Sequence, residues 1–122
     1  MNFTKTPPEL FAFIDNTTKE FKCDVRRMFG GIAYFVNGNM FTGAHQDVLF
    51  VRLPEGDRKT IMEEHDEVSH FEPMPGKRMS EYMAIPESIF SQPDMLHKWL
   101  AKSYRYVSSL SPKIKKGPKK KS

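Results

Sequence analysis

The sequence predicts a single α+β domain in which helices pack on one antiparallel sheet. Near both ends of the chain, apolar residues recur at helical spacing. Short apolar runs separated by Gly, Pro and Asn-Gly signals fill the middle. The expected order is α-β-β-β-α-β-β-α, and a doubly wound parallel sheet would instead alternate strands and helices one for one.

The first helix is expected from about residue 7 to residue 21. Thr6 is a candidate N-cap, Pro7 suits the first helical position, and Glu9 completes a capping box. The residues at helical spacing are Leu10, Phe13, Ile14, Thr17 and Phe21. They predict one buried face.

The segment RMFGGIAYFVNGNMFTGA, residues 27–44, predicts a hairpin. Asn-Gly between apolar runs is typical of a type I′ turn, in which both central residues have positive φ. A turn at Asn37 and Gly38 places Val36 opposite Asn39 and Tyr34 opposite Phe41. A turn at Gly38 and Asn39 would shift this register. A second turn at 43–47 and a strand at 48–53 complete a three-stranded meander.

The second half of the chain predicts one more helix, two strands and a final helix. The helix covers about 55–65, the strands 68–73 and 77–86, with a turn at 73–76. Ser91, Pro93 and Asp94 form a helix start, and Pro112 ends that helix. Its apolar stripe consists of Leu96, Trp99, Leu100, Ser103, Tyr106, Val107 and Leu110.

The adjacent Gly30 and Gly31 raise the alternative of a phosphate-binding loop. Both the Walker A pattern and the dinucleotide-binding glycine pattern are absent around them. A strand-like Ile-Ala-Tyr-Phe-Val run follows, where a phosphate loop needs a helix N-terminus. The glycines are therefore expected to permit a bulge or a close backbone approach.

The chain of 122 residues carries a net charge of +4, but this charge is unevenly distributed. Six of the 19 basic residues lie in the last twelve positions, whereas all 15 acidic residues precede them. We therefore expect a domain at 1–110 with a charge of about −2 and a basic, disordered tail at 111–122. The tail lysines are Lys113, Lys115, Lys116, Lys119, Lys120 and Lys121.

These lysines, extended by Lys98, Lys102 and Arg105 on the last helix, predict one possible interface with nucleic acid. Such contacts neutralise phosphates without reading sequence. The alternative is a tail that only keeps the protein in solution. The tail has no aromatic residue for base stacking.

Candidate catalytic residues are few. His65 and His70 lie near several acidic residues, but their spacing matches no zinc motif. Cys23, the single cysteine, lies beside Lys22 and Asp24, and the sequence shows no histidine near it to act as its base. We therefore expect no enzymatic activity, no metal and no cofactor. The lack of a signal-peptide pattern and of a second cysteine favours the cytoplasm.

Several of these segments occur together in one known family. RRMFGGIAYFVNGNMFTGA, then GKRMSEYMAIPES, then LHKWLAKSYRYVSSLSPK resemble the N-terminal domain of the TfoX/Sxy family, over roughly residues 9–113. The resemblance implies an α+β domain with an antiparallel sheet. The named members regulate competence for DNA uptake and also carry a C-terminal domain, whereas this chain resembles a single-domain relative.

The expected function is therefore that of a regulatory or adaptor domain that binds a protein partner, with a transcription regulator as the candidate partner. The candidate contact surface is a sheet edge or the hairpin, with Tyr34, Asn37, Asn39 and Phe41. A sheet edge would equally permit a homodimer. Two alternatives remain: a nucleic-acid-binding protein, and a small-ligand binder or enzyme with a pocket under the hairpin.

Overall fold

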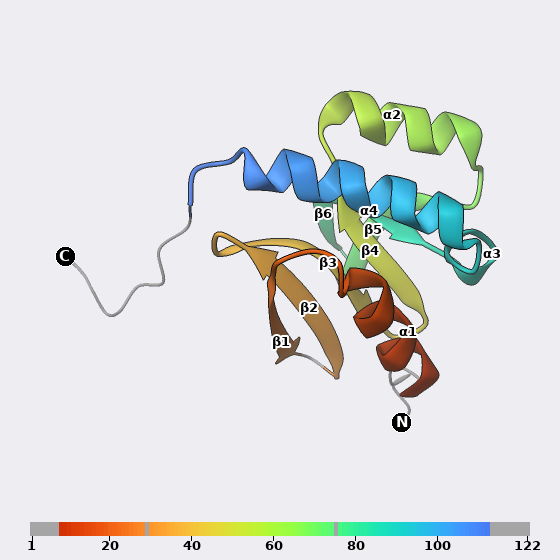
Figure 1. The fold of residues 1–122 in the computed structure, drawn as a ribbon. Helices are drawn as coiled ribbons and strands as arrows, with labels where there is room; N and C mark the ends of the chain where they lie inside the picture. The colour runs from red at the N-terminus through yellow and green to blue at the C-terminus, as the bar shows by residue number, and fades with distance from the viewer. Residues whose placement is uncertain (1–7, 29, 75, 113–122) are drawn as a thin grey trace.

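The computed structural model describes residues 8–28, 30–74 and 76–112, which form one six-stranded antiparallel sheet and four helices (Figure 1). The α+β prediction is confirmed. The elements are α1 (Pro8–Thr18), β1 (Asp24–Met28), β2 (Gly31–Val36), β3 (Asn39–His45), β4 (Val48–Arg52), α2 (Glu55–Glu64), β5 (Ser69–Met74), β6 (Lys77–Ile85), α3 (Glu87–Phe90) and α4 (Pro93–Ser108).

The eight expected elements occur in the predicted order, and the structure adds the short β1 and α3. Helix α1 ends at Thr18, earlier than the expected residue 21. Its last turn is followed by Phe21, whose ring packs against Phe41 and Tyr104, with centroid distances of 6.2 and 5.0 Å. These contacts take the chain out of the helix. The expected capping residues Thr6 and Pro7 lie outside the described residues.

The strands lie in the order β1-β2-β3-β4-β6-β5, so β1 and β5 are the two edges. The predicted meander is present as β2, β3 and β4. Helix α4 lies between α1 and α2 in Figure 1. These helices cover one face of the sheet, where Ile14, Ile61 and Trp99 join the main core fully buried.

The hairpin between β2 and β3 turns at Asn37 and Gly38, whose φ values are 54° and 80°. Val36 pairs with Asn39 as predicted. The predicted pairing of Tyr34 with Phe41 is wrong, because a β-bulge shifts the register and Tyr34 pairs with Thr42. Both aromatic side chains belong to the main core on the face that the helices cover.

The other face of the sheet carries a second, smaller apolar cluster around Phe50 and Phe71. Their rings stack with centroids 4.5 Å apart, although β6 lies between their strands. Gly43 makes room for this arrangement, since a Cβ there would overlap the Phe50 ring and the backbone oxygen of Ile32.

The paired glycines have the geometric roles expected of them. Gly30 occupies the tight turn between β1 and β2 with φ 78°, a conformation that favours glycine. Gly31 begins β2 so close to β3 that a Cβ would overlap the carbonyl oxygen of Ala44. Both positions belong to a hairpin, and a strand follows them where a phosphate loop would have a helix.

Candidate functional site

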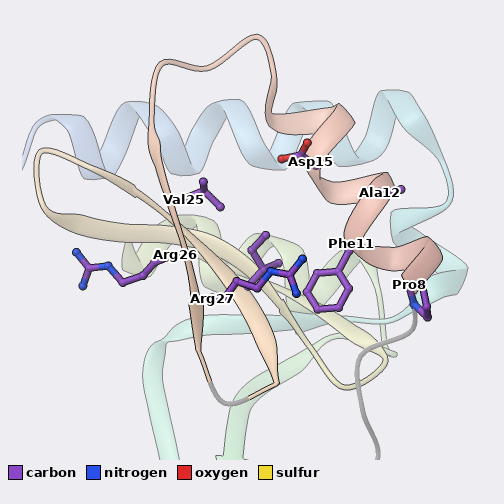
Figure 2. Close-up of a pocket in the computed structure, with 8 residues that line it drawn as sticks. Pro8, Phe11, Ala12, Asp15, Val25, Arg26 and Arg27 are labelled. Carbon is purple, nitrogen blue, oxygen red and sulfur yellow. The ribbon is translucent and has the colours of Figure 1, made fainter.

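An open cleft of about 480 Å³ lies between α1 and the edge of the sheet formed by β1 and β2 (Figure 2). Phe11 and Asp15 line it from α1, and Ile32 lies on β2. Val25 and Arg27 line it from β1. Strand β1 is an edge of the sheet, and no other described strand lies on its outer side. The cleft therefore opens beside a free strand edge of the described structure.

Val25 is the large apolar side chain that stands out on this surface, with 54% of its area exposed. Met28 and Gly31 flank the two-residue turn between β1 and β2. Residues in that position exchange backbone hydrogen bonds, and the pattern then alternates along the strand. The N–H and C=O groups of Val25 and Arg27 therefore point away from β2, toward solvent.

Two arginines extend from β1 to opposite faces of the sheet. The Arg27 guanidinium lies 4.5 Å from the centroid of the Phe11 ring, inside the cleft (Figure 2). Arg26 lies 4.9 Å from the centroid of the Phe35 ring, on the face opposite the helices. Within the described part of the chain, neither arginine has a carboxylate within ion-pair distance.

Asp15 lies at the other end of the cleft, farther along α1 than Phe11 (Figure 2). It accepts a hydrogen bond of 3.1 Å from the buried hydroxyl of Tyr34. Burial, more than the nearby Asp15 carboxylate, raises the pKa of Tyr34 above its ordinary value. The hydroxyl therefore remains a neutral donor that holds Asp15 in place.

The residues predicted to bind a protein partner divide into two groups. The side chains of Tyr34 and Phe41 are buried, with exposed fractions of 2% and 0%, and are thus unavailable as a contact surface in this fold. Asn37 is exposed at the hairpin tip, and Asn39 is partly buried. The Asn39 amide donates a 3.0 Å hydrogen bond to the Ser111 carbonyl. Of the four residues predicted to bind a partner, only the two asparagines are accessible.

The structure describes three of the residues predicted to bind nucleic acid, all on α4. Lys98 lies 3.8 Å from Glu64, and Lys102 lies 4.0 Å from Asp57, so α2 partly neutralises this side of α4. Arg105 is exposed. The tail positions Lys113, Lys115, Lys116, Lys119, Lys120 and Lys121 lie outside the described residues.

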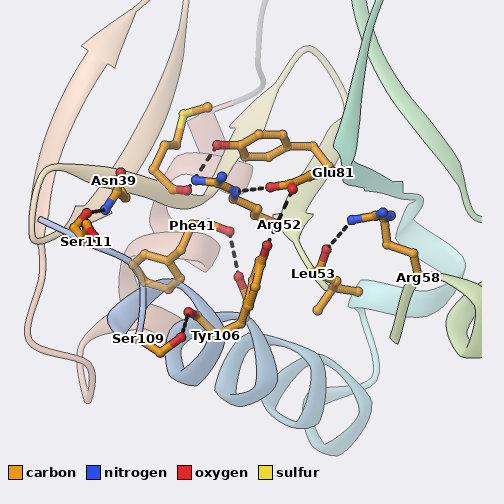
Figure 3. A network of polar contacts seen from close by, with 12 residues as sticks. Asn39, Phe41, Arg52, Leu53, Arg58, Glu81, Tyr106, Ser109 and Ser111 are labelled. Carbon is orange, nitrogen blue, oxygen red and sulfur yellow. Dashed lines mark hydrogen bonds and ion pairs between the residues drawn. The ribbon is translucent and has the colours of Figure 1, made fainter. Parts of the chain in front are cut away.

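A polar network joins the middle of the sheet to α4 (Figure 3). Arg52 pairs with Glu81 at 2.7 Å, and the Tyr106 hydroxyl donates to the other oxygen of Glu81 at 3.4 Å. The Tyr82 hydroxyl donates to the Met40 carbonyl at 3.1 Å, and burial raises the pKa of Tyr82. These contacts connect β3, β4, β6 and α4, and a neutral, buried tyrosine is unsuited to proton transfer near pH 7.

Other candidate reactive groups are similarly unsuited to catalysis. Cys23 is half-buried, and burial together with Asp24 and Asp15 raises the pKa of its thiol. A raised pKa leaves little of the nucleophilic thiolate at neutral pH. Within the described ranges, no three His, Cys, Asp or Glu side chains gather as a metal site would require. None of the described helices is long and apolar enough to cross a membrane.

Val25, Arg26 and Arg27 were absent from the sequence-based site. Two charged residues follow the single valine, so the segment lacks the apolar alternation that predicts a strand. The usable signal was the turn at Gly30. A tight turn followed by a strand requires a partner strand before it, which is β1.

Comparison with protein-family models matches residues 19–107 to the TfoX N-terminal domain. The match includes β1, the whole sheet and nearly all of α4, whereas α1 precedes it. Comparisons with curated proteins and with solved structures gave no match.

Proposed function

Because the chain belongs to the TfoX N-terminal domain family, we propose that it is a non-enzymatic adaptor domain with a regulatory role, which acts by binding another protein. The observation that carries the proposal is the edge strand β1 beside the open cleft, on whose outer side no described strand lies. An exposed valine and outward backbone groups on an edge strand are features that protein partners use.

Three further observations favour binding over catalysis. The TfoX N-terminal domain family is not a known enzyme family. The single cysteine has a raised thiol pKa, which disfavours a nucleophilic role. The cleft itself is lined by Phe11, Val25 and Ile32, with one carboxylate and no histidine among its described residues. This composition suits recognition of another chain.

The lysine-rich tail supports a second function, binding to nucleic acid. Six lysines in twelve residues would give affinity that falls steeply with salt. Against this function, the acids of α2 already lie beside Lys98 and Lys102. We therefore treat nucleic acid as the alternative outcome of the same experiment.

Affinity purification of the full chain from its source cells tests the proposal. Lysates are treated with nuclease and washed at low and high salt, with a chain ending at Ser111 as the comparison. A stoichiometric protein that stays bound to both chains after nuclease and high salt supports an adaptor. Binding that requires the tail and disappears with nuclease or salt supports the nucleic-acid function and refutes the adaptor.

A further inference from the structure

The outer side of β1 has the hydrogen-bonding pattern that an added strand requires. The N–H and C=O groups of Val25 and Arg27 point away from the sheet, as the pairing of Met28 with Gly31 implies. The described residues place no backbone or side chain on these groups. An extended peptide would therefore find a ready row of donors and acceptors.

The charge on this strand indicates the chemistry of the peptide. Arg27 lies in the cleft and Arg26 on the opposite face, and neither has an anionic partner among the described residues. A guanidinium stacked on an aromatic ring still presents its N–H edge to a carboxylate. Acidic side chains at neighbouring positions of an added strand would reach one arginine on each face.

A second copy of this chain fits the same edge poorly. Antiparallel pairing of β1 with itself, centred on Arg26, places Arg26 directly opposite Arg26. This register pairs the whole of Asp24–Met28, whereas registers centred on Val25 or on Arg27 pair only part of the strand. Like charges directly opposite each other destabilise a strand pair. The edge therefore selects a strand of opposite charge over its own copy.

We propose that β1 binds an extended acidic segment of a partner protein, which adds as a further strand at this edge of the sheet. Its carboxylates pair with Arg26 and Arg27, and an apolar side chain packs on Val25. Asp15, at the far end of the cleft, repels a carboxylate there and so restricts where the acidic side chains lie. The inference rests on the proposed adaptor function and names the partner's chemistry.

The test uses fluorescent peptides of repeated Val-Glu-Glu, in which neighbouring glutamates point to opposite faces of an added strand, with Val-Lys-Lys peptides of the same length as the control. Binding to the full chain is measured by fluorescence anisotropy, and backbone amide shifts are recorded by NMR. We expect the glutamate peptide to bind at least tenfold more tightly than the lysine peptide. The largest amide shifts should fall at Val25 and Arg27.

Two variants test the geometry of the edge. Arg27→Glu should weaken binding at least tenfold, whereas Arg78→Glu, an exposed arginine on β6, should change it less than twofold. Val25→Pro removes an N–H that points away from β2, a position at which an edge strand tolerates proline. It should weaken binding strongly, whereas Val25→Ala, which keeps the N–H, should weaken it less. Circular dichroism confirms that each variant is folded.

Equal affinity for both peptides, equal loss in Arg27→Glu and Arg78→Glu, or amide shifts confined to other strands would overturn the inference. Preference for a DNA duplex over the glutamate peptide would overturn it as well. The adaptor function has a separate result in the purification above. A partner captured there whose binding is unchanged by Arg27→Glu would refute this site and leave the adaptor function standing.

Discussion

Replacing Gly31 with alanine tests the geometric role of the paired glycines. Gly31 begins β2, and its Cα faces the backbone of β3. An alanine Cβ there would overlap the Ala44 carbonyl oxygen and lie 3.3 Å from both the Ala44 carbonyl carbon and the His45 Cα. All three atoms belong to the backbone, so no side chain can rotate to relieve the overlap.

The expected cost follows from that geometry. Overpacking of this kind costs about 1–3 kcal/mol. Separation of β2 from β3 at this point weakens a ladder hydrogen bond, which adds roughly 0.5–1.5 kcal/mol. The lower entropy of the unfolded alanine chain offsets about 0.4–1 kcal/mol. We expect a net loss of about 2–3 kcal/mol and a fall in Tm of roughly 4 °C for each kcal/mol.

Gly56→Ala is the matched control. Gly56 lies in α2 with nothing within 4 Å of an added Cβ, so alanine should stabilise the protein by about 0.5–1 kcal/mol. Differential scanning calorimetry of both variants provides the comparison. A Gly31→Ala protein that melts within one or two degrees of the parent would refute the close-approach argument, because the strands could then separate without cost.

Three further results are expected. Ser103→Ala leaves the buried Phe41 carbonyl without its 2.9 Å hydrogen-bond donor and should lower the free energy of unfolding in urea by about 1–2 kcal/mol. The exposed control Ser109→Ala should change it by under about 0.5 kcal/mol. Equal effects of the two substitutions would contradict this. Because burial raises the pKa of Cys23, its alkylation by iodoacetamide should reach half its maximal rate above pH 9.0, and a midpoint at or below that pH would be inconsistent. Phe71→Ala removes a stacked, buried ring and should cost about 3–5 kcal/mol in thermal unfolding, so a loss under about 1 kcal/mol would show that the second cluster contributes little.

Features with short-range causes were predictable from the sequence alone. The turn at Asn37 and Gly38 follows from the positive φ that both positions require. The buried stripe of α4 follows from helical spacing, and Leu96, Trp99 and Val107 are indeed buried. The C-terminal ends of β4 and β6 follow from the prolines just beyond them, Pro54 and Pro86. Each of these signals lies within one element or one turn.

The tertiary structure decided the features that depend on segments distant in sequence. Tyr34 and Phe41 are core residues because helices pack over their face of the sheet, and a β-bulge moves the register by one position so that Tyr34 pairs with Thr42. Acidic residues of α2 lie beside Lys98 and Lys102 and partly neutralise that surface of α4. No local sequence pattern indicates this pairing. The charged sequence of β1 does not predict a strand. Its strand conformation follows from its pairing with β2. The cleft beside Arg27 exists because folding brings α1 next to that edge, and contacts between distant segments leave no periodic signal in the sequence.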